Sequence, residues 1–150
     1  MHHGKLSPVF FGSALTNFGV EPFLKKFLVM TPPPTARQSD IGVIDPFDDN
    51  FSAFVFKIQA NMNKAHRDRI AFMRICSGKF ERGKEVWHVQ GGKKMQLAQP
   101  QQLMAQDRSI VDEAYAGDII GVFDPGIFSI GDTVCSPAKK CTFSGIPTFA

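Results

Sequence analysis

Two apolar runs separated by a short basic segment constrain the fold of this chain most strongly. Residues 52–60 alternate with a period of two, which predicts a strand. The side chains expected on one face of that strand are Phe54, Phe56, Ile58 and Ala60. Residues 70–76 are apolar except at Arg74, so this second predicted strand should be buried on both faces.

The rest of the second half repeats short apolar segments with turn residues between them. Residues 90–93 (QGGK) predict a tight turn, because two glycines separate apolar runs. The other expected strand segments are 85–89, 102–105, 110–116, 118–123 and 131–135. Short strands at this spacing predict a mainly β fold and a closed antiparallel β-barrel, which leaves no edge strand exposed.

The first 40 residues have a different pattern. Residues 8–14 (PVFFGSA) predict a short buried parallel strand. Residues 20–30 carry apolar side chains at offsets 0, 3, 4, 7 and 8, which predicts a helix with one apolar face. The prolines at 32–34 should end that helix and begin a stiff linker. We therefore expect a tag remnant at 1–3, a strand-plus-helix unit at 4–30, a linker at 31–40 and a β-barrel domain at 41–150.

Composition excludes several classes of protein. A hydrophobic fraction of 43% with 21% charged residues is typical of a globular domain and not of a disordered chain. No apolar run approaches the ~20 residues that span a bilayer, so no membrane association is expected. Cys76, Cys135 and Cys141 contain no C-x-x-C pair, which favours reduced thiols in a cytoplasmic protein and predicts no metal site.

Charge is unevenly distributed along the chain. Residues 57–94 hold ten Lys/Arg and three Asp/Glu, a net of +7, whereas residues 101–132 hold one Arg and six Asp/Glu, a net of −5. Such polarity suits a protein with one face toward a polyanion and another away from it. A solvated basic loop on an ordinary barrel would give the same pattern.

The basic segment between the first two predicted strands supplies the candidate RNA-binding residues. These are Lys64, His66, Arg67 and Arg69. An Arg fork donates two hydrogen bonds to a phosphate, which is the chemistry RNA docking needs. The alternative is that Arg67 or Arg69 pairs with a neighbouring acid and fixes the loop.

No autonomous active site is predicted, and no catalytic residue is assigned. The chain has no G-x-S-x-G and no G-x-x-x-x-G-K-[ST], and residues 91–94 (GGKK) are a turn and not a phosphate loop. Asp45, Asp48 and Asp49 lack the alternating spacing of a calcium loop, so a turn role is expected.

Several longer stretches resemble the class II peptide-chain release factors, a family of ribosome-bound translational GTPases. The stretches are 10–15 (FFGSAL), 17–20 (NFGV), 54–62 (FVFKIQANM), 66–69 (HRDR), 72–74 (FMR), 76–78 (CSG), 104–108 (MAQDR), 113–121 (EAYAGDIIG) and 130–133 (IGDT). Gly78, Gly83 and residues 131–133 are similar to the second domain of translation GTPases in general. Residues 57–61 and 66–69 are more specific to the release factors.

The resemblance implies a fold, a role and partners. The fold is a translation-factor second-domain β-barrel, preceded by a strand-plus-helix remnant of an α/β GTPase domain in which Ser13, Ala14 and Leu15 form the last guanine-recognition motif. The family uses GTP or GDP and Mg²⁺, but its other nucleotide motifs are not in this sequence, so this chain alone is expected to bind no cofactor and to be inactive as a GTPase. The barrel is expected to be a monomer that docks on small-subunit ribosomal RNA, and the family promotes departure of the class I release factor.

Two other functions stay open at this point. One is a stand-alone RNA-binding β-barrel with no GTPase parent. The other is a barrel from an unrelated enzyme, in which His66 or Asp118 would be catalytic.

Overall fold

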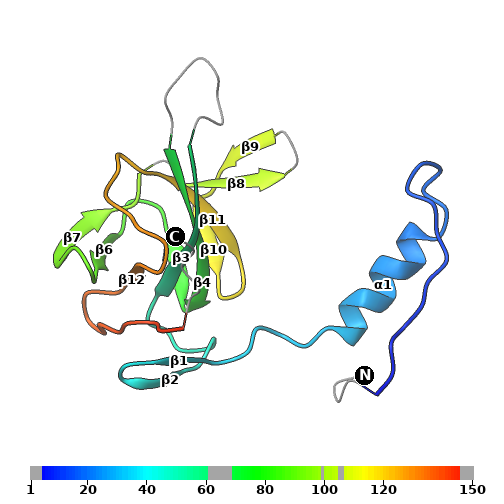
Figure 1. The fold of residues 1–150 in the computed structure, drawn as a ribbon, viewed down its shortest axis with the longest axis horizontal. Helices are drawn as coiled ribbons and strands as arrows, with labels where there is room; N and C mark the ends of the chain where they lie inside the picture. Colours follow the sequence, from blue (N-terminus) through cyan, green and yellow to red (C-terminus); the bar gives the residue numbers. More distant parts are fainter. Residues whose placement is uncertain (1–4, 61–68, 99, 105–106, 146–150) are drawn as a thin grey trace. The chain divides into compact units, whose positions relative to one another are not determined.

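The computed structural model describes residues 5–60, 69–98, 100–104 and 107–145 (Figure 1). The chain separates into two compact units, Met1–Pro33 and Pro34–Ala150, so the boundary falls inside the proline run. In the described residues the fold is mainly β with a single helix. No described helix has the length and apolar character needed to cross a membrane.

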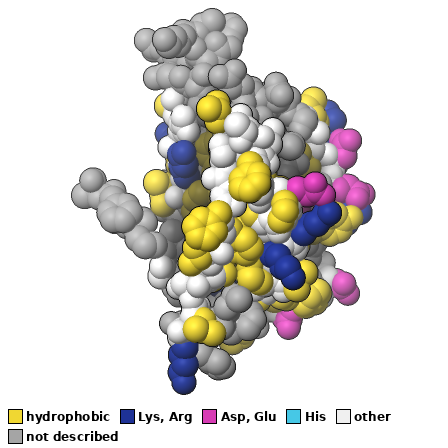
Figure 2. Space-filling view, turned by 90° about the vertical axis from the view of Figure 1, so that its right-hand side faces the viewer, with side chains coloured by type: hydrophobic (Ala, Val, Ile, Leu, Met, Phe, Trp, Pro, Cys, Tyr) yellow, Lys and Arg dark blue, Asp and Glu magenta, His cyan; other side chains and the backbone are white. Residues whose placement is uncertain are grey.

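The first unit contains α1 (Val20–Met30), which confirms the predicted helix. Gly19 adopts a positive φ of 73° just before it, and the Thr31 amide donates to the Phe27 carbonyl at its end. The apolar face of α1 is not buried; Phe23 makes an edge contact with Phe10, their ring centroids 5.2 Å apart. On the face drawn in Figure 2, hydrophobic side chains reach the surface in several places, with Lys and Arg side chains between them.

The predicted strand at residues 8–14 is wrong. These residues form no ladder; the only pairing is an isolated bridge between Ser13 and Phe18. Phe11, which a buried strand would cover, is 87% exposed. The physical reason is that a strand exists through its hydrogen-bonded neighbours, and the described part of this unit has no other strand to offer them.

The second unit is built from short strands. They are β1 (Arg37–Ser39), β2 (Gly42–Ile44), β3 (Ser52–Ala60), β4 (Arg69–Ser77), β5 (Lys79–Glu81), β6 (Glu85–His88), β7 (Lys93–Gln96), β8 (Gln101–Met104), β9 (Asp107–Ile110), β10 (Glu113–Tyr115), β11 (Ile119–Phe123) and β12 (Thr133–Cys135). Eight of them form one antiparallel sheet in the order β7-β6-β12-β3-β4-β11-β8-β9. The β6–β7 hairpin confirms the predicted turn at residues 90–93. The β1–β2 hairpin was not predicted, and β1 lies within the segment expected to be a linker.

The predicted closed barrel is not what the described residues form. The large sheet ends at the edge strands β7 and β9, and no described ladder joins them, so the sheet is a half-barrel (Figure 1). At Gly78, where φ is 66°, the chain turns a corner between β4 and β5. Beyond this corner β5 pairs with β10 in a separate ladder. Residues 79–81, which form β5, therefore leave the main sheet, and the chain rejoins it at β6.

A β-bulge in β3 corrects the face predicted for its side chains. Val55 is opposite Met73, but Lys57 is opposite Phe72, so Phe56 is the extra residue. Past the bulge the alternation is shifted by one position. Ile58 consequently packs with the core that contains Val55, and not on the face of Phe54 as the period of two predicted.

Both faces of the β3–β4 pair are covered by apolar side chains. The main core lies on one face and includes Val55, Met73 and Ile120, all essentially inaccessible to solvent. A second cluster on the other face is formed by Ile44, Phe54, Cys76, Cys135, Cys141 and Phe143. Among the β4 side chains Arg74 alone is fully exposed, as the sequence predicted.

Shortening a side chain in the main core should destabilise the second unit. Met73→Ala removes buried methylene groups and leaves a cavity, so we expect a loss of about 2–5 kcal/mol in unfolding free energy. Urea unfolding followed by the fluorescence of Trp87, the single tryptophan, measures it. Met30→Ala, which makes the same change at the end of α1, should leave the Trp87 transition unchanged. A loss below about 1 kcal/mol for Met73→Ala would contradict the core assignment.

Candidate nucleic-acid interface

In the sequence, the four predicted RNA-binding residues fall between the end of β3 and the start of β4. Lys64, His66 and Arg67 fall outside the described residues. Arg69 is described and is the first residue of β4. His66, the candidate of the enzyme alternative, therefore has no described position either.

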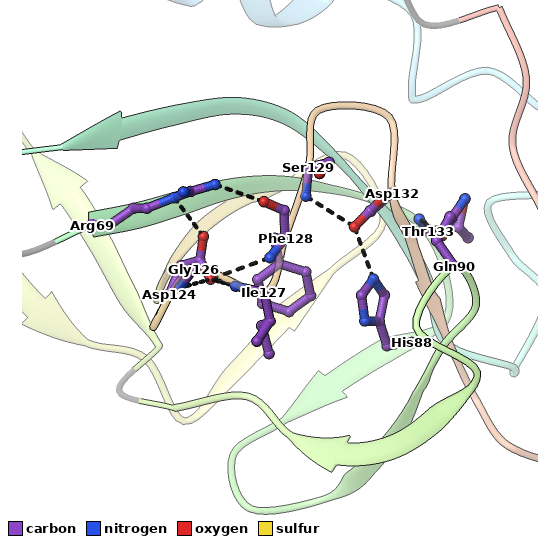
Figure 3. Close-up of polar contacts among 10 residues, drawn as sticks. All are labelled: Arg69, His88, Gln90, Asp124, Gly126, Ile127, Phe128, Ser129, Asp132 and Thr133. Atoms are coloured by element: carbon purple, nitrogen blue, oxygen red, sulfur yellow. Dashed lines mark hydrogen bonds and ion pairs between the residues drawn. The ribbon is translucent and has the colours of Figure 1, made fainter.

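Arg69 is held by the segment that follows β11 (Figure 3). Its Nε atom lies 2.8 Å from Oδ2 of Asp124, and its terminal nitrogen donates to the Phe128 carbonyl at 2.7 Å. The Nε contact is short but badly aligned for a hydrogen bond, so it acts as an ion pair. The Asp124 side chain is fully buried while that of Arg69 is 39% exposed. Internal pairing thus holds for Arg69, and a contact of its exposed part with RNA stays a prediction.

Asp124 also shapes the loop behind Arg69. Its Oδ1 atom accepts hydrogen bonds from the amides of Gly126, Ile127 and Phe128, at 2.9, 2.8 and 3.2 Å. An aspartate that accepts amides two to four residues ahead closes a tight turn. One buried carboxylate therefore fixes both the turn at residues 124–128 and the first side chain of β4.

A second buried pair continues the same loop (Figure 3). His88 Nε2 lies 2.8 Å from Oδ2 of Asp132, and the Ser129 amide donates to the same oxygen at 2.9 Å. The rings of His88 and Phe128 pack edge to face, with their centroids 5.0 Å apart. Gly91 is required here, because a Cβ at this position would lie 2.4 Å from His88 Nδ1. Sequence reasoning missed this pair, since 44 residues separate its members and nothing local signals their contact.

Ion pairs join the basic and acidic segments of the sequence. Besides Arg69–Asp124, Lys79 contacts Glu113 at 2.6 Å and Arg82 contacts Asp112 at 3.3 Å. These ion pairs bring residues of the basic and acidic segments together. The expected separation into one basic and one acidic face is therefore only partly present.

The predicted guanine-recognition residues form a turn in the first unit. The Ser13 amide donates to the Phe18 carbonyl at 2.9 Å, and Leu15 is 95% exposed. Ser13 and Ala14 line a hollow of about 420 Å³ with Phe10 and Phe23. These residues offer an apolar wall and small side chains, which fit the edge of a base. The described residues that line this hollow include no Lys or Arg to hold a phosphate, so the hollow fits the edge of a base and not a whole nucleotide.

The remaining motifs have structural roles. Asp45 and Asp48 accept the amides of Phe47 and Asn50, as the predicted turn role requires. In the described ranges, no group of three or more His, Cys, Asp or Glu side chains is arranged to hold a metal ion. The three cysteines are free and buried, and burial raises the pKa of Cys76 to about 11.

Comparison with known proteins identifies the class of this domain. The family model of elongation factor G domain 2 matches residues 50–137, and the chain belongs to that family. Over nearly its whole length the chain is also similar to proteins named Peptide chain release factor 3, which confirms the resemblance seen in the sequence. It is 66% identical over 147 residues to the one from Symbiobacterium thermophilum, with 98% of this chain and 28% of that protein covered.

Two further proteins with the same name are also similar to this chain over nearly its whole length. The identity is 53% over 150 residues for Rippkaea orientalis and 56% over 146 residues for Listeria monocytogenes serotype 4a, covering 100% and 97% of this chain. The chain spans 28% of the length of these relatives.

Removing the buried charge at residue 124 should loosen the base of the basic segment. Asp124→Asn leaves the Arg69 guanidinium without its partner and weakens the turn, so we expect a loss of about 2–4 kcal/mol in unfolding free energy. Asp112→Asn breaks an exposed ion pair with Arg82 and should cost less than about 1 kcal/mol. Urea unfolding of both variants measures this difference. Equal losses would show that the Asp124 contacts are not specially stabilising.

The pair of Asp48 and Lys139 should make stability depend on acid pH. The hydrogen bond from Lys139 lowers the pKa of the Asp48 carboxyl from 3.8 to about 2. A carboxyl whose pKa is lower in the folded state stabilises the fold above its unfolded pKa, and this contribution is lost as pH falls from about 4 toward 2. Lys139→Gln should therefore be less stable than the parent chain near neutral pH, by up to about 1 kcal/mol, and the difference should shrink as the pH falls from about 4 through 2.

Thermal unfolding at a series of pH values checks this dependence. Lys93→Gln, which removes an exposed charge from β7, is the matched control and should show no difference between neutral and acid pH. A stability gap for Lys139→Gln that persists unchanged to pH 2 would contradict the assignment.

Proposed function

We propose that this chain is the ribosome-docking segment of a GTP-dependent translation termination factor. In this proposal the whole protein binds the ribosome and promotes departure of the class I release factor, and the second unit of this chain docks on small-subunit ribosomal RNA. The observation that carries the proposal is the similarity of almost the entire chain to proteins named Peptide chain release factor 3. The match to the elongation factor G domain 2 model supports a translation factor in particular.

The contacts of Arg69 support a docking role for the segment beside it. A loop that meets a rigid RNA surface binds more tightly when its base is already ordered, because less conformational entropy is lost on binding. Arg69 is tied to Asp124 and Phe128, so the start of β4 has a fixed place before any partner arrives. Lys64, His66 and Arg67 precede this anchor in the sequence and are the proposed phosphate contacts.

In this proposal, most of the nucleotide-binding site belongs to the rest of the protein. Release factors of this family use GTP or GDP with Mg²⁺, and Ser13, Ala14 and Leu15 would cover one edge of the guanine. When bound, the nucleotide supplies the energy difference between two states of the factor. The residues of this chain contribute a wall for the base, and no hydrolytic step is assigned to them.

Neutralising the basic segment should weaken ribosome binding. Lys64→Gln with Arg67→Gln removes two proposed phosphate contacts, so we expect about tenfold weaker binding of the 150-residue chain and a salt slope smaller by about 1.4 to 1.8. Co-sedimentation with purified ribosomes across a series of KCl concentrations measures both quantities. Lys93→Gln with Lys94→Gln removes the same charge from β7 and should change binding less than twofold. Parallel behaviour of the two double variants would refute docking through the segment before Arg69.

A further inference from the structure

A groove lies on the outer face of the sheet, opposite the main core. It has a volume of about 460 Å³, which falls in the range of ~300–1,000 Å³ typical of small-molecule sites. The strand register shows why three of the lining residues are neighbours. Lys57 of β3 is opposite Phe72 of β4, and Phe72 is opposite Gly121 of β11. Phe56 and Ile119 complete the apolar lining. The bulge at Phe56 is what brings Lys57 to this register.

Three cations follow the same face of the sheet. The Lys57 ammonium lies 5.4 Å from the centre of the Phe72 ring, and the Arg37 guanidinium lies 4.2 Å from the centre of Phe54. Arg74 is exposed and is the cross-strand partner of Phe54. None of the three cations forms an ion pair with another described residue, in contrast to Arg69, Lys79 and Arg82.

One carboxylate at the groove offsets part of this charge. Asp118 lines the groove, but its Oδ2 atom accepts the Tyr115 amide at 2.9 Å and so closes a turn. Among the residues that line the groove, Lys57 offsets this carboxylate, and Arg74, the cross-strand partner of Ile119, adds a second positive charge at the edge. The balance is therefore one positive charge. The ligand of the groove should therefore be anionic.

The apolar part of the groove restricts the ligand further. Ile119 is 46% exposed and Phe123, which follows on the same face of β11, is 40% exposed. A free phosphate would gain nothing from such side chains, whereas a flat base next to a phosphate would use both features. A base can reach the groove only when it is unstacked and unpaired.

We propose that this groove binds one unstacked nucleotide of single-stranded RNA, with the base against Phe56, Phe72 and Ile119 and the phosphate at Lys57 and Arg74. The inference rests on the proposed docking of this unit on RNA and adds a second contact to it. RNA is favoured over an acidic peptide because β3 leads from Lys57 directly to the basic residues 64–69.

Binding of a fluorescein-labelled single-stranded hexanucleotide to the 150-residue chain tests the groove. Lys57→Gln with Arg74→Gln, the groove variant, should weaken binding about tenfold and lower the salt slope by about 0.7, the contribution of one single-strand phosphate contact. Ile119→Ser should weaken binding several-fold with an unchanged slope, because it removes apolar contact and no charge. The control variant with Lys93→Gln and Lys94→Gln should bind like the parent chain. The Trp87 unfolding transition shows that each variant is folded.

Three results would overturn the inference. The first is equal affinity of the groove variant and the control variant for the hexanucleotide. The second is equally tight binding of an RNA duplex of the same length, since a duplex presents no unstacked base. The third is a glutamate-rich peptide that competes with the RNA and binds more tightly than it.

The same variants in ribosome co-sedimentation separate this inference from the proposed function. If the groove variant binds ribosomes like the parent while the variant with Lys64→Gln and Arg67→Gln does not, the groove inference fails and the proposed function stands. If the groove variant loses ribosome binding as well, both are supported. If neither variant loses it, RNA docking by this unit fails.

Discussion

The pairing of β3 with β4 is the interaction on which the rest of the second unit depends. These two strands form the centre of the large sheet, and both of their faces carry apolar side chains. Burial on both faces requires the pairing to be exact in register, because a slip by one residue would exchange Val55 and Phe54 between two different cores. The bulge at Phe56 is one of two shifts in this register, and it turns Lys57 to the outer face beside Phe72. One extra residue thus separates the part of β3 that only packs from the part that can meet a ligand.

The sequence allowed the strands to be predicted well and their connections poorly. The runs that became β3, β4 and β6, and the turn at residues 90–93, were predictable because alternation, apolar runs and paired glycines are local signals. The bulge at Phe56 was not, since it exists only in relation to β4. The strand expected at residues 8–14 failed for the same reason, because an apolar run cannot reveal whether a partner strand lies beside it. The open sheet was not predictable either, because the pairing of β5 with β10 outside the main sheet is a long-range contact.

Much the same holds for the candidate site. The basic segment and Arg69 could be picked out from composition, but the sequence could not tell which cations would be neutralised. Arg69 was expected to pair with a near neighbour if it paired at all, and its partner Asp124 lies 55 positions further along the chain. The pair of His88 and Asp132 was invisible because neither residue stands in a recognisable motif with the other. Long-range polar contacts follow from the topology, and the topology was the weakest part of the prediction.

The fold sorts the positive charges of the chain into two groups with different physical roles. Arg69, Lys79 and Arg82 meet acids of the segment 112–124, so their charges hold strands and turns together. Lys57 and Arg74 lie on the outer face without such partners among the described residues, next to apolar side chains that are partly exposed. The contact of the Lys57 ammonium with the Phe72 ring is worth only about 0.5–1 kcal/mol at an exposed site, so this arrangement gives the isolated domain little stability. A ligand that carries both an anion and a flat apolar surface satisfies both at once, and a nucleotide is such a ligand. In the proposed RNA contact, the charge available for binding is therefore the part that the fold has not already neutralised.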